Sequence, residues 1–285
     1  MDFMKKNEMI QLAVFDSAKN RGLKEFLSRN VRELILYRYA LYNLISTNLR
    51  ARYRRSTIGF LWTLLNPLFT MIIIAVVFST LFNLPFADFG VYLFSGILTW
   101  TLISNSIVSG SMSMINAEGY LKKVYVPKLI FPLATVGVET ANFLFSLISL
   151  FVLALFLGAK ASLGLLFLPF ALLMTALFVF GLVAIVSIVT VYFRDLAHIL
   201  TIVFLGLFYL TPIMYKKELI TSVNLMTVIK MNPFYYFIEL FHQIIYEAKI
   251  PDGSLWLTCG ALMLVSLMVG LYVFSLKEKD IVYRL

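Results

Sequence analysis

The chain has 285 residues, of which 61% are hydrophobic and only 14% are charged, and its formal net charge is +9. Soluble domains are about half apolar and about a quarter charged, so this composition excludes an ordinary soluble domain and predicts an integral membrane protein. The basic residues cluster at the ends of apolar runs, which argues against nucleic acid as the partner of the positive charge.

The N-terminal part precedes the first long apolar run. Residues 1–30 are mixed and charged and show no cleavable signal peptide, so we expect a cytoplasmic segment there. Residues 31–56 are predicted to form an amphipathic helix in the membrane interface, because apolar residues recur on one side at about 100° per residue. Packing as an ordinary soluble helix is the alternative.

The stretch LRARYRRSTIGFLWTLLNPL, residues 49–68, sets the densest positive charge directly against that apolar run. Its four arginines are Arg50, Arg52, Arg54 and Arg55. Because Lys and Arg hold the end of a span in the cytoplasm, we expect them to fix the start of the first membrane helix on that side.

Residues 57–276 are predicted to be a transmembrane domain, since six of its segments meet or approach the ~20 apolar residues that a spanning helix needs. The predicted spans are 57–82, 90–113, 128–157, 163–192, 196–214 and 255–276. The sequence therefore predicts an all-α integral membrane protein with six transmembrane helices and a cytoplasmic tail at 277–285.

The distribution of Lys and Arg predicts the orientation. If both termini and the second and fourth connections are cytoplasmic, that side holds 19 of the 24 basic residues. Such an excess agrees with the positive-inside rule, so we expect both termini in the cytoplasm.

Two interior regions interrupt this simple pattern. Residues 116–126, NAEGYLKKVYV, are predicted to form a short cytoplasmic helix that Pro127 stops. Residues 215–254 are too apolar for a free outside loop, and a helix of about 15 residues starting at Asn232–Pro233 is too short to span. We expect a re-entrant or interfacial helix there. Four of its polar residues share one side by their three- and four-residue spacing: Glu239, His242, Gln243 and Glu247.

No catalytic chemistry is visible in the sequence. There is no phosphate-binding G-x-x-x-x-G-K-[ST] loop, the two histidines lie far apart, and no cluster offers a nucleophile or a metal site. We expect no catalytic residues, no metal and no cofactor in this chain, so energy for active transport would come from a partner.

Five stretches in order along the chain resemble a known family: ARYRRSTIGFLWTLLNPL, GYLKKVYVPKLIFPLATV, YFRDLAHI, FYLTPIMY and NPFYYFIELF. They are similar to the membrane subunit of type-2 ABC exporters for lipid-linked polysaccharides, O-antigen or teichoic acid. The resemblance implies a permease in the bacterial cytoplasmic membrane, a homodimer of six-helix subunits with a channel between them, and two separate subunits that bind ATP and Mg. Membrane lipids and the glycan would be the other partners.

The same resemblance suggests roles for two groups of residues. The short cytoplasmic helix would be the coupling helix that contacts the ATPase, through Glu118, Gly119, Tyr120, Leu121, Lys122 and Lys123. An ordinary positively charged loop is the alternative. The four arginines either attract the pyrophosphate of the lipid carrier or anchor the chain to anionic lipid head groups, and the second interpretation is favoured.

Glu139 lies near mid-bilayer in the third predicted span, so it either lines the pore or pairs inside the bundle. Aromatic rings that line a pore could stack on the flat faces of sugars. The candidates are Phe60, Trp62, Trp100, Phe204, Phe208 and Tyr209. Interfacial belts and lipid-facing packing explain such aromatics equally well.

Three other functions remain open from the sequence. The first is a type-2 ABC permease for a smaller lipid or drug. The second is an integral-membrane glycan-modifying enzyme, for which His198 and His242 lack convincing partners. The third is a channel or structural membrane protein without an ATPase, and only the ABC interpretations predict a stoichiometric ATP-binding subunit.

Overall fold

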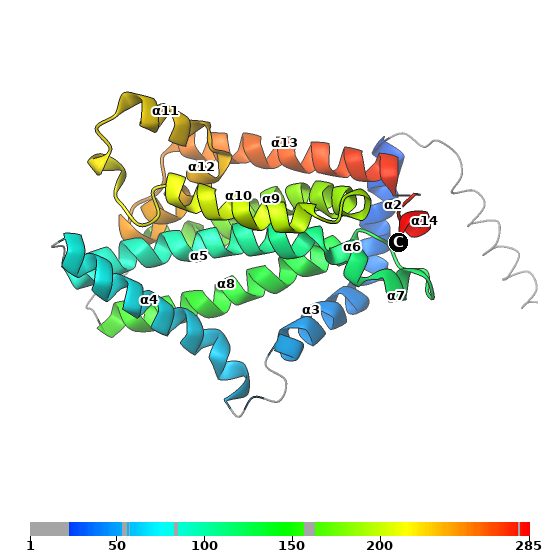
Figure 1. Cartoon of the computed structure of the whole chain (residues 1–285), viewed down its shortest axis with the longest axis horizontal. Helices are drawn as coiled ribbons and strands as arrows, with labels where there is room; N and C mark the ends of the chain where they lie inside the picture. The colour runs from blue at the N-terminus through cyan, green and yellow to red at the C-terminus, as the bar shows by residue number, and fades with distance from the viewer. Residues whose placement is uncertain (1–22, 53–55, 57, 83–84, 157–162, 279) are drawn as a thin grey trace, which may run out of the picture.

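The computed structural model describes residues 23–285 except 53–55, 57, 83–84, 157–162 and 279. The regular structure of these residues is entirely helical. Five of the helices are long and apolar enough to cross a membrane, and they run side by side or slightly splayed (Figure 1). They are α4 (Trp62–Phe82), α5 (Phe86–Ser111), α8 (Ile130–Phe156), α9 (Leu168–Tyr192) and α13 (Gly253–Lys277). The predicted all-α membrane fold is confirmed.

The fifth predicted span, 196–214, is shorter than expected. Its helix α10 (Leu196–Leu210) has 15 residues, fewer than the ~20 that cross a bilayer as a straight helix. The backbone leaves the helix at Thr211, with φ −92° and ψ 137°. Pro212 follows, and a residue before proline is biased towards extended backbone, so the apolar run continues after the helix has ended.

The predicted interface helix is bent into two pieces, α2 (Leu23–Leu36) and α3 (Arg38–Arg52), which run in different directions in Figure 1. Leu41 and Leu44 pack against the start of α8, and Ile45 lies so close to Gly137 that a Cβ there would collide with it. Other apolar residues of α2 and α3 stay exposed, among them Tyr42 at 66%. The pair therefore covers the bundle with one side and leaves apolar surface on another.

Close backbone contact joins α9 to α13. A Cβ on Gly270 would overlap the carbonyl of Gly181, and a Cβ on Gly181 would overlap the backbone of Ser266. The Ser266 hydroxyl donates a hydrogen bond of 2.7 Å to the Phe178 carbonyl. Small residues and a hydroxyl of this kind are how membrane helices associate without a hydrophobic driving force.

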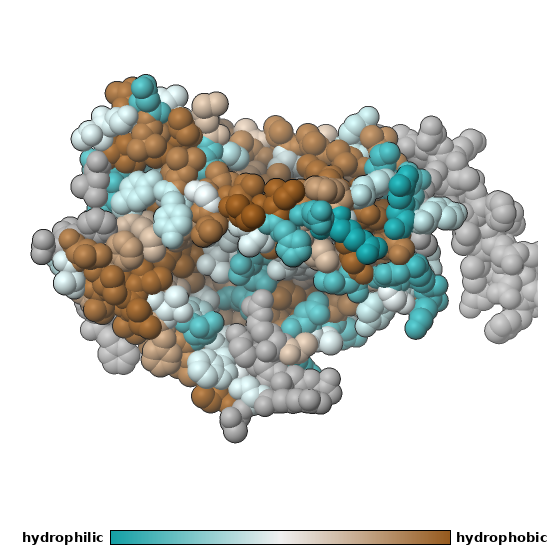
Figure 2. Space-filling model, in the orientation of Figure 1, coloured by the Kyte–Doolittle hydropathy of each residue, from teal (hydrophilic) through white to brown (hydrophobic). Residues whose placement is uncertain are grey.

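The two described ends of the chain lie at the same end of the bundle (Figure 1). Arg29 on α2 forms an ion pair of 2.8 Å with Glu278, just after α13, and Lys128 donates to the Glu278 carbonyl. The last helix, α14 (Ile281–Arg284), follows. Figure 2 shows hydrophilic residues gathered towards this end, while hydrophobic residues dominate the rest of the visible face.

The opposite end holds α11 (Val223–Met231), α12 (Pro233–Phe241) and a π-helical turn, His242–Tyr246. Asn232 caps α12 by accepting a hydrogen bond of 3.0 Å from the Phe234 amide. Phe237, Leu240 and Phe241 are fully buried, so α12 is inserted among the long helices. Helix and turn together match the short helix predicted to begin at Asn232–Pro233.

Candidate functional site

An exposed knob projects where the coupling helix was predicted. It is built from α6 (Ser113–Asn116) and α7 (Glu118–Leu121), which continue α5 almost without interruption. The Ala117 side chain between them is buried, whereas Tyr120 is 60% exposed. The knob is thus tied to a long helix on one side and, through Pro127, leads into α8 on the other.

The six predicted coupling residues lie together on this knob. Lys122 forms an ion pair of 2.6 Å with Glu118, one turn away, and this hydrogen bond lowers the pKa of the Glu118 carboxyl. A Cβ on Gly119 would meet nothing within 4 Å, so the surface around it is open. Leu121 packs inwards against Phe131, and Lys122 and Lys123 are exposed. Contact with an ATPase stays a prediction.

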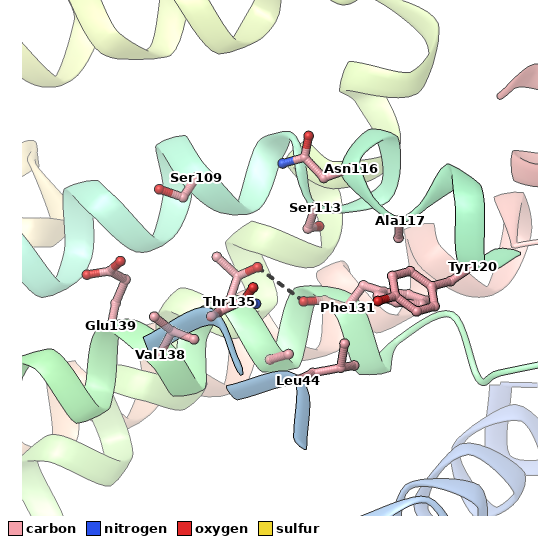
Figure 3. Close-up of a pocket in the computed structure, with 12 residues that line it drawn as sticks. Leu44, Ser109, Ser113, Asn116, Ala117, Tyr120, Phe131, Thr135, Val138 and Glu139 are labelled. Carbon is pink, nitrogen blue, oxygen red and sulfur yellow. Dashed lines mark hydrogen bonds between the residues drawn. The ribbon is translucent and has the colours of Figure 1, made fainter. Parts of the chain in front are cut away.

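A cavity of about 290 Å³ lies behind the knob, between α3, α5–α6 and α8. Figure 3 shows Ser109, Ser113 and Asn116 on one wall and Thr135 and Glu139 on the wall that α8 supplies. The lining also includes Leu44 and Asn48 of α3 and Tyr120 of α7. Glu139 and Tyr120 stand out separately in the sequence, but this cavity does not, because spacing along the chain does not show how α3 packs over α5 and α8.

Glu139 is only 4% exposed, and the Asn142 amide donates a hydrogen bond of 3.0 Å to its carboxylate. The residue therefore pairs with a neighbour on its own helix and lines a cavity. A buried carboxylate needs such polar neighbours, because desolvation of the charge is costly. Its role in a pore stays a prediction.

The arginines are only partly described. Arg50 is exposed near the end of α3. The structure describes the backbone of Arg52 but not its side chain. Arg54 and Arg55 lie outside the described residues. Neither the pyrophosphate role nor the lipid anchor is tested.

The aromatic pore candidates fall in different environments. Trp100 and Phe204 are buried, each 6% exposed, and their ring centroids lie 5.7 Å apart. Phe208 joins them at 5.9 Å from Trp100, and Phe234 of α12 lies 5.4 Å from Phe204. These rings pack α10 and α12 onto α5 within the subunit.

The other aromatic candidates are more accessible. Tyr209 is 66% exposed on α10, and Trp62 at the start of α4 is partly buried. The side chain of Phe60 lies outside the described residues. Their pore role stays a prediction.

A second polar cluster lies at the α12 end, where the sequence indicated only a shared polar side. Glu239 pairs with Lys217 at 2.5 Å and accepts a hydrogen bond of 3.2 Å from Gln243. Gln243 in turn accepts a hydrogen bond of 3.2 Å from the Asp252 amide. The cluster therefore ties the buried helix to the segments before and after it. Among the described residues, no group of three His, Cys, Asp or Glu side chains could hold a metal ion.

Comparison with known proteins agrees with this architecture. The family model for the ABC-2 type transporter matches residues 39–246. The O-antigen export system permease protein RfbA of Myxococcus xanthus is 29% identical over 253 residues, which cover 88% of this chain and 97% of that protein. Two proteins of the same name from Klebsiella pneumoniae are 27% and 28% identical over 187 residues, covering 65% of this chain and 72% of each relative.

The family match begins within the predicted interface helix and covers nearly all of α3, the knob, the first five predicted spans and the helix buried at the opposite end. It extends over well more than half of the 285 residues. The chain therefore belongs to the ABC-2 type transporter family.

Proposed function

We propose that this protein is the membrane permease of an ATP-driven exporter that moves a lipid-linked polysaccharide of the O-antigen class across the bacterial cytoplasmic membrane. The observation that carries the proposal is the similarity to an O-antigen export permease over 97% of that protein's length. The long apolar helices supply the membrane passage that such a function requires.

In this proposal the chain performs no covalent chemistry itself. A separate subunit binds ATP and Mg and hydrolyses ATP, and the exposed knob receives the resulting movement. The knob suits this role, because Ala117 and Leu121 anchor it on α8 while Lys122 and Lys123 are exposed. A short rigid element joined directly to two long helices can pass a displacement of the ATPase to the bundle.

The active unit would be a homodimer with two ATPase subunits. Apolar side chains on α4 and α10 support the proposal of a second copy, since Ile73 is 63% exposed and Ile202 is 71% exposed. Lipid covers whatever part of these surfaces the second copy leaves free.

Both termini would lie in the cytoplasm. Three observations support this orientation: the excess of Lys and Arg in the sequence segments assigned to the cytoplasm, the ion pair that brings α2 to the end of α13, and the position of the knob at the same end as that pair (Figure 1). The ATPases would therefore meet the knob on the side where ATP is present.

Purification of the tagged chain from its native membrane tests the proposal. We expect a stoichiometric subunit with Walker motifs to co-purify, and removal of the gene to abolish surface polysaccharide while lipid-linked glycan accumulates inside. A pure chain without an ATP-binding partner would instead favour a channel or a glycan-modifying enzyme. Normal surface polysaccharide together with loss of drug or lipid efflux would favour a permease for smaller substrates.

A further inference from the structure

We propose that the cavity between α3, α5–α6 and α8 is a subsite for one sugar ring of the exported glycan, next to the knob that faces the ATPase. The inference rests on the proposed export function and adds the place where the permease itself binds sugar. The cavity volume of about 290 Å³ lies just below the ~300–1,000 Å³ typical of small-molecule sites, so the cavity accommodates one ring rather than a chain.

The lining is polar where a membrane bundle is normally apolar. Seven of the twelve lining residues have polar side chains, and they come from three separate parts of the chain. The Ser113 hydroxyl is the clearest sign of a ligand: the residue is 7% exposed, and its oxygen has no hydrogen-bond partner among the described residues. A buried hydroxyl without a partner costs free energy, which a ligand that donates or accepts a hydrogen bond would recover.

The charge of the lining favours a sugar over a phosphate. Among the lining residues that the structure describes, Glu139 is the only charged one, and none of them is Lys or Arg. A pyrophosphate would meet repulsion from this carboxylate, and none of the described lining residues carries a positive charge to offset it. Sugar hydroxyls, in contrast, can donate to the carboxylate while Ser, Thr and Asn side chains both donate and accept.

Asn142 holds the Glu139 carboxylate in place through its hydrogen bond, so the acceptor facing the cavity is oriented before a ligand arrives. A pre-oriented charged acceptor binds a hydroxyl more strongly than a neutral one, because hydrogen bonds to ionised groups are roughly twice as strong. Glu139 is therefore the side chain that would contribute most to sugar binding.

The aromatic rings lie at the knob end of the cavity. Tyr120 of α7 and Phe131 of α8 both line it, with ring centroids 6.4 Å apart. Figure 3 shows both rings at the opposite end of the cavity from Glu139. A sugar held by its hydroxyls at Glu139 would place its C–H faces towards these rings. Because Tyr120 belongs to the knob, an occupied subsite would bear directly on the element that meets the ATPase.

Protection of an introduced cysteine from labelling tests the subsite in the complete exporter complex. Asn48 lines the cavity, whereas Asn43, which is also exposed and lies on the same helix, is not among the lining residues. We would compare Asn48→Cys with Asn43→Cys, each with Cys259→Ala, and measure the rate of modification by a charged methanethiosulfonate in lipid nanodiscs. The probes are lipid-linked glycan extracted from the source cells and polyprenyl diphosphate without sugar.

With the glycan at about ten times its Kd, the unoccupied fraction falls about elevenfold, so labelling of Asn48→Cys should slow about tenfold while Asn43→Cys is unaffected. Polyprenyl diphosphate should protect neither position. Glu139→Gln should raise the glycan concentration needed for half-protection by about tenfold, as loss of a charged acceptor predicts. Equal protection by polyprenyl diphosphate would show a lipid or phosphate site, and unprotected Asn48→Cys would overturn the proposal.

ATP hydrolysis in the same samples separates this inference from the proposed function. If the glycan stimulates hydrolysis but leaves Asn48→Cys unprotected, the export function stands and the subsite is wrong. If the glycan protects Asn48→Cys without stimulating hydrolysis, the cavity binds the glycan but the export function is wrong. If neither occurs, both are wrong.

Discussion

The contact between α9 and α13 allows the packing of the bundle to be tested by a single methyl group. A Cβ on Gly270 would overlap the Gly181 carbonyl, and a backbone group cannot yield without movement of the whole helix. Overpacking of this kind costs about 1–3 kcal/mol. Part of this cost is offset, because Ala is more favourable than Gly in a helix by up to about 1 kcal/mol. We therefore expect Gly270→Ala to lower the free energy of unfolding by up to about 2 kcal/mol.

The assay is thermal unfolding in a mild detergent, for which about 2–4 °C per kcal/mol is expected in a chain of this size class. Gly260→Ala is the matched control, since it lies on the same helix and its Cβ would meet nothing within 4 Å. We expect Gly270→Ala to lower the Tm by several degrees and Gly260→Ala to leave it unchanged or raise it slightly. Equal Tm values for the two variants would refute the close contact of α9 with α13.

Three further substitutions test the function and the polar clusters. Tyr120→Ala should reduce transport per ATP hydrolysed severalfold while the complex still assembles, because this 60% exposed ring belongs to the knob. An unchanged ratio would show that the residue has no part in coupling. Arg50→Gln should leave glycan-stimulated ATP hydrolysis unchanged if the arginine only anchors the chain to lipid, and a marked loss of stimulation would show a substrate role instead. Lys217→Met should lower the free energy of unfolding by roughly 1–3 kcal/mol, because it strips the buried Glu239 of its cation, and Glu239→Gln in the same chain should restore part of it. No recovery in the double variant would mean that the two side chains do not depend on each other.

The sequence predicted the long helices well, because the thickness of the bilayer imposes their length and hydropathy. Their positions in α4, α5, α8, α9 and α13 agree with five predicted spans to within several residues at each end. Apolar length alone failed for α10, where the backbone becomes extended at Thr211 before a proline although the apolar run continues.

Features that depend on contact between distant segments were missed. The bend at Tyr37 has no strong breaker such as Pro or Gly in the sequence, and it places α3 against α8. The cavity behind the knob exists only because of that placement, so Glu139 could be recognised as unusual but not assigned to a site.

The polar cluster at the α12 end was partly foreseeable. The four-residue spacing predicted that Glu239 and Gln243 would share a side, and they form a hydrogen bond. The partner Lys217 lies 22 positions away in sequence and could not be assigned from helical periodicity. The buried Trp100 and Phe204 show the same limit, since an aromatic residue suited to a pore and one suited to a helix interface look identical in sequence.

The most direct test of the account is glycan translocation in proteoliposomes that contain either this chain alone or this chain with its ATP-binding subunit. The account predicts that lipid-linked polysaccharide crosses the membrane only when both proteins and hydrolysable ATP are present, and stops with a non-hydrolysable analogue. Equally fast translocation by the chain alone, without ATP, would contradict it.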